Sequence, residues 1–181
     1  MNKTREITLC GIIAAAYVAL TWITLPVAFT PIQLRLSELL TLIPFFFPPA
    51  AIALTVGCFF ANIFSNAFDL FLGPLATLIA AFFTAYAGRK YRKRFEEGVS
   101  PLKIKKSEYF FAVFPPVIFN AVIVSLALTI PSATNEIFLT VYLTNFVSIF
   151  ASEIVSCAIL GVPFIFLLNK YDVLSALNRK K

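Results

Sequence analysis

The sequence of 181 residues contains no histidine, and its three cysteines, Cys10, Cys58 and Cys157, lie far apart in separate apolar runs. Without histidine, metal sites and catalytic triads that depend on imidazole are excluded. The cysteines form no CxxC pair, and the chain gathers too few ligands in one place for a zinc site. We therefore interpret them as small side chains that face lipid or another helix, and we expect no metal.

Glycine is also scarce, and none of the six glycines is followed by lysine. A phosphate-binding loop of the form GxxxxGK[ST] is therefore missing, as are the HExxH and GxSxG motifs of hydrolases. ATP chemistry cannot be local to this chain. We predict that it is not an enzyme and that it needs no cofactor.

Charged residues make up only 13% of the chain, whereas 60% is hydrophobic and 21 residues are phenylalanine. A soluble domain is about a quarter charged, and a water-soluble core of this length does not bury so many rings. The excess apolar surface is expected to face lipid, which predicts an all-α integral membrane protein. The net charge of +6 comes from short basic clusters between apolar runs. This pattern sets membrane orientation and does not indicate nucleic-acid binding.

Four apolar runs have the roughly 20 residues that a helix needs to cross about 30 Å of hydrocarbon. The first is longer than the apolar core of a signal peptide, so we expect it to be retained. The stretch 36–67 is too long for one span and short for two, and Pro48-Pro49 divides it. If it forms two helices, the three basic clusters lie on one side, which the positive-inside tendency favours.

The sequence thus predicts a six-transmembrane-helix bundle in the cell (plasma) membrane, multi-pass, with both termini in the cytoplasm. It forms a single transmembrane domain over residues 1–181. The approximate spans are 7–29, 36–48, 50–67, 70–88, 109–131 and 138–168, and a basic cytoplasmic loop covers 89–108.

Arg35 is the one basic residue that falls outside the cytoplasmic clusters of this topology. It stands close to Gln33, Ser37 and Glu38. Polar groups in hydrocarbon are costly unless they are paired, so they are candidates for function. Arg35 and Glu38 are three positions apart and can pair on a helix face. The alternative is an interfacial salt bridge that only fixes the helix end.

The third predicted span carries Asn62, Asn66 and Asp69 at the spacing of one stripe on its external half. Asp69 also suits a cap for the helix that follows. Asn62 lies deeper, and we expect it to matter more.

The fifth and sixth predicted spans add further polar groups. Asn120 is an amide near the middle of the fifth span, and Glu153 is the only charge inside the sixth. Such amides often only join helices. Glu153 needs either a basic partner, for which Arg35 is the candidate, or a proton. The polar face around Glu153 covers an arc of about 100° and comprises Tyr142, Asn145, Ser152, Glu153 and Ser156.

Together these groups predict a pocket that is open to the outside. Amides, a carboxylate and aromatic rings suit a flat heterocycle that forms hydrogen bonds. A carboxylate accepts two hydrogen bonds from an N–H and an adjacent NH₂, as in guanine-like rings, and Tyr or Phe rings stack on such a ring.

The first span carries small residues at Gly11, Ala15 and Ala19, four positions apart. This spacing lets another helix approach closely. The other helix belongs either to this chain's own bundle or to a partner membrane protein.

These residues resemble the substrate-binding S components of energy-coupling factor (ECF) transporters, and among them the QueT family. The resemblance extends over nearly the whole chain, and its best carriers are Gly11-xxx-Ala15-xxx-Ala19, Ile32–Glu38, Leu42–Ala50, Gly57–Asn62, and Asn145 with Glu153. It implies a helical bundle of the ECF S-component type that binds a vitamin or precursor from outside. It also implies docking, through the small-residue face, onto a transmembrane coupling protein with two cytosolic ATPases.

Members of the QueT family are assigned to queuosine precursors, which are 7-deazaguanines, or to the base queuine. On that basis Glu153 is expected to accept from the N–H/NH₂ edge of the base, and Glu38 to balance an aminomethyl charge or orient Arg35. The remaining polar edge of the base would form hydrogen bonds with Asn145, Asn120 and Asn62. The expected substrate-binding residues are Arg35, Glu38, Asn62, Asn66, Asn120, Tyr142, Asn145 and Glu153.

Three alternatives stay open at this point. The same groups can hold another purine-like or pterin-like ring. A self-sufficient secondary transporter or small channel is the second, although the sequence shows no internal repeat. The third is a purely structural membrane subunit, in which the polar residues serve only packing.

Overall fold

The structure is a computed structural model that describes residues 3–28, 33–97 and 104–170, and within these residues it contains helices but no strand. For these residues the all-α prediction is confirmed. The elements η1 and η2 are 3-10 helices, and η3 is a π-helix. In chain order the elements are α1 (Lys3–Ile23), α2 (Leu25–Ala28), η1 (Leu36–Phe45), α3 (Ala50–Ala61), η2 (Asn62–Phe64), α4 (Ala67–Ala87), α5 (Arg89–Glu96), α6 (Lys106–Thr129), α7 (Phe138–Glu153), η3 (Ile154–Leu160) and α8 (Gly161–Lys170).

Within the described ranges, four stretches are long and apolar enough to cross a membrane, namely α1, α4, α6 and the continuous helix Phe138–Leu168. Large apolar side chains lie on their outer faces, among them Ile7, Phe71 and Val147, which are 72%, 66% and 65% exposed. Lipid is the solvent that accepts such a surface. Two shorter apolar helical segments, Leu36–Phe45 and Ala50–Phe64, coincide with the second and third predicted spans.

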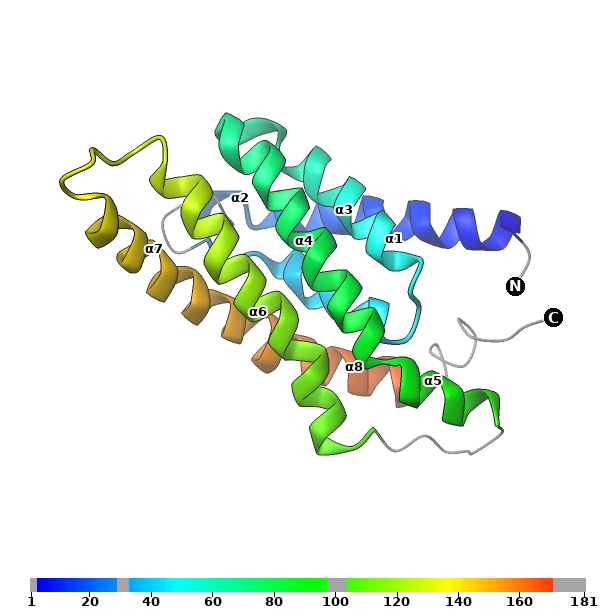
Figure 1. The fold of residues 1–181 in the computed structure, drawn as a ribbon. Coiled ribbons are helices and arrows are strands. Elements are labelled where there is room, and N and C mark those ends of the chain that lie inside the picture. The colour runs from blue at the N-terminus through cyan, green and yellow to red at the C-terminus, as the bar shows by residue number, and fades with distance from the viewer. Residues whose placement is uncertain (1–2, 29–32, 98–103, 171–181) are drawn as a thin grey trace.

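The proline pair forms a turn between two helices and not a kink within one. Pro48 and Pro49 lie between the end of η1 at Phe45 and the start of α3 at Ala50. Proline has no N–H to donate, so neither helix continues across the pair. Figure 1 shows η1 and α3 running in opposite directions on either side of this turn.

Some boundaries differ from those predicted. The first run, predicted as 7–29, breaks after Ile23 into the short helix α2, and its last predicted residue lies outside the described ranges. The third run ends as an α-helix at Ala61 instead of residue 67, and α4 begins at Ala67 instead of Leu70. Asn62, Asn66 and Asp69 therefore do not form one stripe along a single helix.

Apart from Arg35, the basic residues of the described ranges gather at one end of the bundle. Figure 1 shows the N-terminal end of α1, helix α5 and the C-terminal end of α8 at this end, and α2 and the connection between α6 and α7 at the other. Lys3 and Arg5 lie in the first of these elements and five basic residues in the second. The remaining terminal lysines and arginines, and loop residues 98–103, lie outside the described ranges.

Helix α5 is tied to the C-terminal end of η1. The Arg92 guanidinium donates to the carbonyl oxygens of Phe45 at 2.5 Å and Ala85 at 2.7 Å. Gly88 allows the close approach, because a Cβ there would lie 1.9 Å from the Phe45 carbonyl oxygen. Tyr91 packs against Phe45 and Phe46, and burial raises its pKa to about 12. The phenol therefore stays neutral at physiological pH.

The last long helix changes its hydrogen bonding in the middle. It runs as an α-helix through Glu153, as a π-helix from Ile154 to Leu160, and as an α-helix again from Gly161. π-Helical turns are rare and are often found at functional sites. In this chain the change begins directly after the buried carboxylate of Glu153, which is 6% exposed.

Candidate functional site

A buried ion pair lies at the end of the bundle that is opposite the basic helix α5. Arg35, in an extended conformation just before η1, donates to Asp69 Oδ2 at 3.0 Å and to Asn62 Oδ1 at 3.0 Å. The side chains of Arg35 and Asp69 are 5% and 0% exposed. The cation and anion, both withdrawn from solvent, depend on each other, because an isolated buried charge is strongly destabilising.

Local structure explains how Asn62 and Asp69 meet. The α3 helix ends at Ala61, and the chain turns through η2 into α4, where Asn66 caps the helix by accepting from the Asp69 N–H at 2.9 Å. The Asn62 amide then reaches back to donate to the Asp69 carbonyl oxygen at 3.2 Å. Gly73 makes room for both side chains, since a Cβ there would lie 2.5 Å from Asn62 Nδ2 and 3.0 Å from Asp69 Oδ1.

Two carboxylates meet deeper in the bundle. Asn120 on α6 donates through one Nδ2 to Glu38 Oε2 at 3.1 Å and to Glu153 Oε1 at 2.9 Å. This amide joins residues that are 82 and 33 positions away in the chain. All three side chains are at most 6% exposed. Arg35 is the candidate basic partner that the sequence offers for Glu153, with a proton as the alternative, and the contacts that the structure shows for this carboxylate are with Asn120 and Cys157.

Each carboxylate has a second donor. Tyr17 on α1 donates to Glu38 Oε1 at 2.5 Å, and Cys157 Sγ donates to Glu153 Oε2 at 3.4 Å. The site therefore draws on α1, η1, α6, α7 and η3. The sequence gives no sign of a role for Tyr17, whose position in an apolar run is typical of an ordinary core residue. Cys157 is likewise expected from the sequence only to pack against lipid or another helix.

Two buried oxygen atoms at this site have no hydrogen-bond partner among the residues that the structure describes. They are Asp69 Oδ1 and Asn120 Oδ1. Buried polar atoms are nearly always paired, so each exception needs an explanation. Asn120 also lines a small cavity of about 10 Å³, which is roughly the space of one water molecule. The cavity lining is polar on several sides and comprises Gln33, Arg35, Glu38, Cys58, Gly73, Thr77, Asn120, Val124, Ile149 and Glu153.

Gln33 is held in an unusual backbone conformation beside this cavity. Its φ is +46°, and its side chain is only 5% exposed. Non-glycine residues with positive φ are uncommon and often occur at functional sites. Gln33 belongs to the polar group around Arg35 that the sequence marks out, but its conformation could not be predicted.

Four of the eight expected substrate-binding residues line the cavity, and four lie elsewhere. Asn62 supports Arg35 from behind, and Asn66 caps α4. Tyr142 and Asn145 join α7 to α6, where they donate to the Val122 carbonyl oxygen at 3.4 Å and to Thr129 Oγ1 at 3.1 Å. The cavity-lining members of the predicted set are Arg35, Glu38, Asn120 and Glu153.

The small residues of α1 lie on an open face. Gly11, Ala15 and Ala19 are all exposed, and a Cβ built at Gly11 would have nothing within 4 Å. The neighbouring Ala14 faces inward instead, where a Cβ at Gly57 of α3 would lie 2.9 Å from its carbonyl oxygen. Packing within this chain's own bundle therefore uses a different side of α1 in the described structure.

Lipid-facing helices that enclose a polar site of arginine, carboxylates and an amide define a membrane protein that handles a small polar solute. The chain belongs to the family described as QueT transporter, whose sequence model matches residues 7–170. A relative from Lactococcus lactis subsp. cremoris, named queuosine precursor transporter QueT, is 30% identical over 162 residues, which cover 88% of this chain and 92% of the relative. No solved structure matches the chain. The expected family is thus confirmed, and the chain is a multi-pass membrane protein.

Proposed function

We propose that this chain is the membrane-embedded substrate-binding component of an ECF-type importer and that it takes up a queuosine precursor from outside. The name of the relative supports the substrate class. One structural observation carries the assignment of the site: Asn120 bridges Glu38 and Glu153 while its own buried Oδ1 has no partner. A ligand that carries hydrogen-bond donors can bind the free Asn120 Oδ1 and the two carboxylates.

The polar groups of the cavity complement a 7-deazaguanine. In this proposal Glu153 accepts the two hydrogen bonds from the ring N–H and the adjacent NH₂, a geometry that fits a carboxylate. Asn120 Oδ1 accepts from a further donor, and Arg35 donates to the ring carbonyl. Glu38 lies opposite and balances a positive substituent or orients the other groups.

Binding requires the cavity to widen. A bicyclic ring does not fit a space of about 10 Å³. The outer half of α7 packs chiefly against α6, whereas η3 packs against η1. We therefore expect α7 to move away from α6 during entry, breaking the weak contacts of Tyr142 and Asn145. These two residues, and Asn62 and Asn66, remain proposed ligand contacts of the widened state.

Six membrane crossings complete the proposal, with η1 and α3 as the two short ones. The alternating directions in Figure 1 and the gathering of basic residues at one end support cytoplasmic termini. The single transmembrane domain of residues 1–181 follows from this topology. ATP hydrolysis belongs to two cytosolic ATPases, which act through a transmembrane coupling protein.

Thermal unfolding of the detergent-solubilised protein tests the substrate. A ligand that binds only the folded state raises the free energy of unfolding by RT ln(1 + [L]/Kd), or about 2.7 kcal/mol at one hundred times Kd. For a chain of this size that is a rise of roughly 5–10 °C in the melting temperature. We expect it with queuine and 7-deazaguanine precursors but not with riboflavin, folate or thiamine. A rise with one of those vitamins instead would mean that the chain is still a substrate-binding component, but for a different substrate. No rise with any of them would favour a channel or a structural subunit.

The exposed face of α1 is the proposed docking surface for the coupling protein. Ala15 and Ala19 border an apolar groove between α1 and α3 with a volume of about 520 Å³. Gly11 is exposed about one helical turn before Ala15. An Ala15→Leu variant fills this face and should lower ATP-driven uptake at least about tenfold, because close helix contact depends on small residues. Substrate binding should be unchanged. Uptake is measured in vesicles that contain the assembled transporter.

Ala151→Leu is the matched control for this variant, because Ala151 is an exposed alanine on α7, away from the groove. It should transport normally. Equal loss in both variants would point to a general effect of added bulk. Unchanged transport in Ala15→Leu would show that the coupling protein does not dock on this face of α1.

A further inference from the structure

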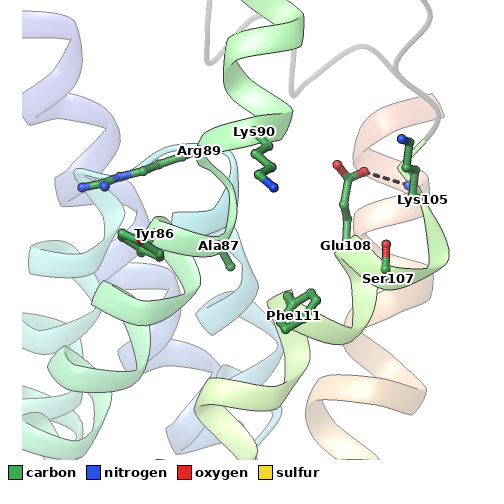
Figure 2. A pocket seen from close by; sticks show the side chains of 8 residues that line it. All are labelled: Tyr86, Ala87, Arg89, Lys90, Lys105, Ser107, Glu108 and Phe111. Atoms are coloured by element: carbon green, nitrogen blue, oxygen red, sulfur yellow. Dashed lines mark hydrogen bonds between the residues drawn. The ribbon is translucent and has the colours of Figure 1, made fainter.

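A cavity at the basic end of the bundle lies between the end of α4 and the start of α6. Its volume is about 630 Å³, and Figure 2 shows the eight side chains that line it: Tyr86, Ala87, Arg89, Lys90, Lys105, Ser107, Glu108 and Phe111. The proposed transport mechanism does not use it. It is separate from the polar cavity around Asn120, with which it shares no residue.

The rim of this cavity is cationic. In Figure 2 the Lys90 side chain points into the space between the two helices, and Lys105 stands at the opposite edge. Within the described ranges, neither ammonium group has a carboxylate within 4.0 Å. Arg89 extends away over the ring of Tyr86, with its guanidinium carbon 4.3 Å from the ring centroid, and adds a third positive charge at the edge.

The carboxylate of Glu108 also faces the cavity, but its charge is already compensated. It forms an ion pair with Arg94 and accepts from the Lys105 backbone N–H at 2.8 Å. Glu108 thereby fixes the first turn of α6. The rim retains a net positive charge from Arg89, Lys90 and Lys105.

The base of the cavity is apolar and opens toward the lipid-facing surface. Ala87 and Phe111 form its floor beneath the charged rim, and the rings of Tyr86 and Phe111 are both 57% exposed. The cavity also lies where two membrane-capable helices end, at Ala87 and Lys106. This is the depth at which hydrocarbon gives way to headgroups.

We propose that this cavity binds the phosphate headgroup of an anionic phospholipid. Lys90 and Lys105 bind the phosphate, Ser107 donates a hydrogen bond to it, and the acyl chains lie against Phe111 and Tyr86. Basic cavities between membrane helices recognise such headgroups, and each nearby lysine contributes about fivefold to affinity. A soluble phosphate would meet the same cations but would leave the apolar floor uncovered.

Native mass spectrometry with equal amounts of phosphatidylglycerol and phosphatidylcholine tests the proposal. The unmodified protein should retain phosphatidylglycerol preferentially. The double variant Lys90→Gln/Lys105→Gln should lose roughly 30-fold of this preference. Both lysines are exposed, so the substitution leaves the packed core intact.

The matched control is Lys93→Gln/Lys106→Gln, which removes the same charge from the same two helices but outside the cavity. It should change the preference by no more than about threefold, because long-range surface charge is screened. An equal loss in both double variants would reduce the effect to general surface charge and overturn the site. Displacement of phosphatidylglycerol by millimolar inorganic phosphate would identify a soluble-anion site instead. Absence of any preference in the unmodified protein would also overturn the proposal.

Discussion

Replacing Arg35 by methionine is expected to lower the free energy of unfolding by about 3–5 kcal/mol, because Asp69 would remain buried without its cation. Methionine keeps the apolar stem of the side chain, so the loss comes mainly from the charge and its hydrogen bonds. For a chain of this size, the change corresponds to a fall in melting temperature of roughly 10 °C or more. Thermal unfolding in a single detergent measures it.

Two further variants separate the buried pair from other effects. Arg35→Met/Asp69→Asn removes both charges and should be more stable than Arg35→Met alone, because no unpaired ion is left. Arg94→Met breaks an ion pair with Glu108 in which both partners are partly exposed, and it should cost only about 1 kcal/mol. Equal losses in Arg35→Met and Arg94→Met would contradict the interpretation of a dependent buried pair.

Replacing Glu153 by glutamine is expected to weaken binding of the queuosine precursor about 100-fold. The amide still accepts from Asn120 but has one oxygen instead of two, so a paired N–H/NH₂ edge loses a charge-assisted hydrogen bond and meets an opposing NH₂ group. Stability should change little, because the side chains have the same size. Equilibrium binding of the precursor in detergent or nanodiscs measures the effect.

Glu136→Gln is the control for this substitution, since Glu136 is exposed in the turn before α7. Its affinity should equal that of the unmodified protein. If Glu153→Gln bound the precursor with unchanged affinity, Glu153 would be only a partner of Asn120. The base would then have to be recognised by another group of the cavity, with Glu38 the first to test.

Several features of the fold could be predicted because they depend on local sequence. The long apolar runs predict the helices α1, α4 and α6. Pro48-Pro49, taken with the positions of the basic clusters, favours a break between η1 and α3. The sequence also marks Arg35 as a candidate for function, because in the predicted topology it lies outside the cytoplasmic basic clusters that set membrane orientation. The structure shows it 4% exposed and bound to a carboxylate.

The pairings within the site could not be predicted, because they join residues that are distant in the chain. The nearest carboxylate to Arg35 in sequence is Glu38, yet the ion pair that the structure shows is with Asp69, 34 positions away. Only the turn through η2 and the side-by-side packing of α3 and α4 bring Asp69 there. Asn120 likewise reveals its role only when α6 lies beside η1 and α7.

Another difference comes from distance along the helix: α7 is a regular α-helix from Phe138 to Glu153, and the 11 positions between Tyr142 and Glu153 separate them by about 16 Å. A constant rotation of about 100° per residue placed Tyr142 and Glu153 on one polar face. In the structure Glu153 reaches the cavity, whereas Tyr142 bonds to the backbone of α6. Tyr17 and Cys157 were missed for a different reason: hydroxyl and thiol groups in an apolar run give no sign of the carboxylate that each will contact.

The π-helical turns after Glu153 make the length of the last helix as important as its composition. Widened turns accommodate a residue more than an α-helix of the same rise, so deleting one position between Ile154 and Leu160 would restore ordinary α-helical turns and keep the two halves aligned. Deleting a second position would turn the two halves against each other by about 100°. Glu153 on one side and Ile165, which is packed in the core on the other, could not then both keep their places. Over evolutionary time this segment should therefore accept the loss of one residue but not of two, whereas the exposed turn at 131–136 should accept both.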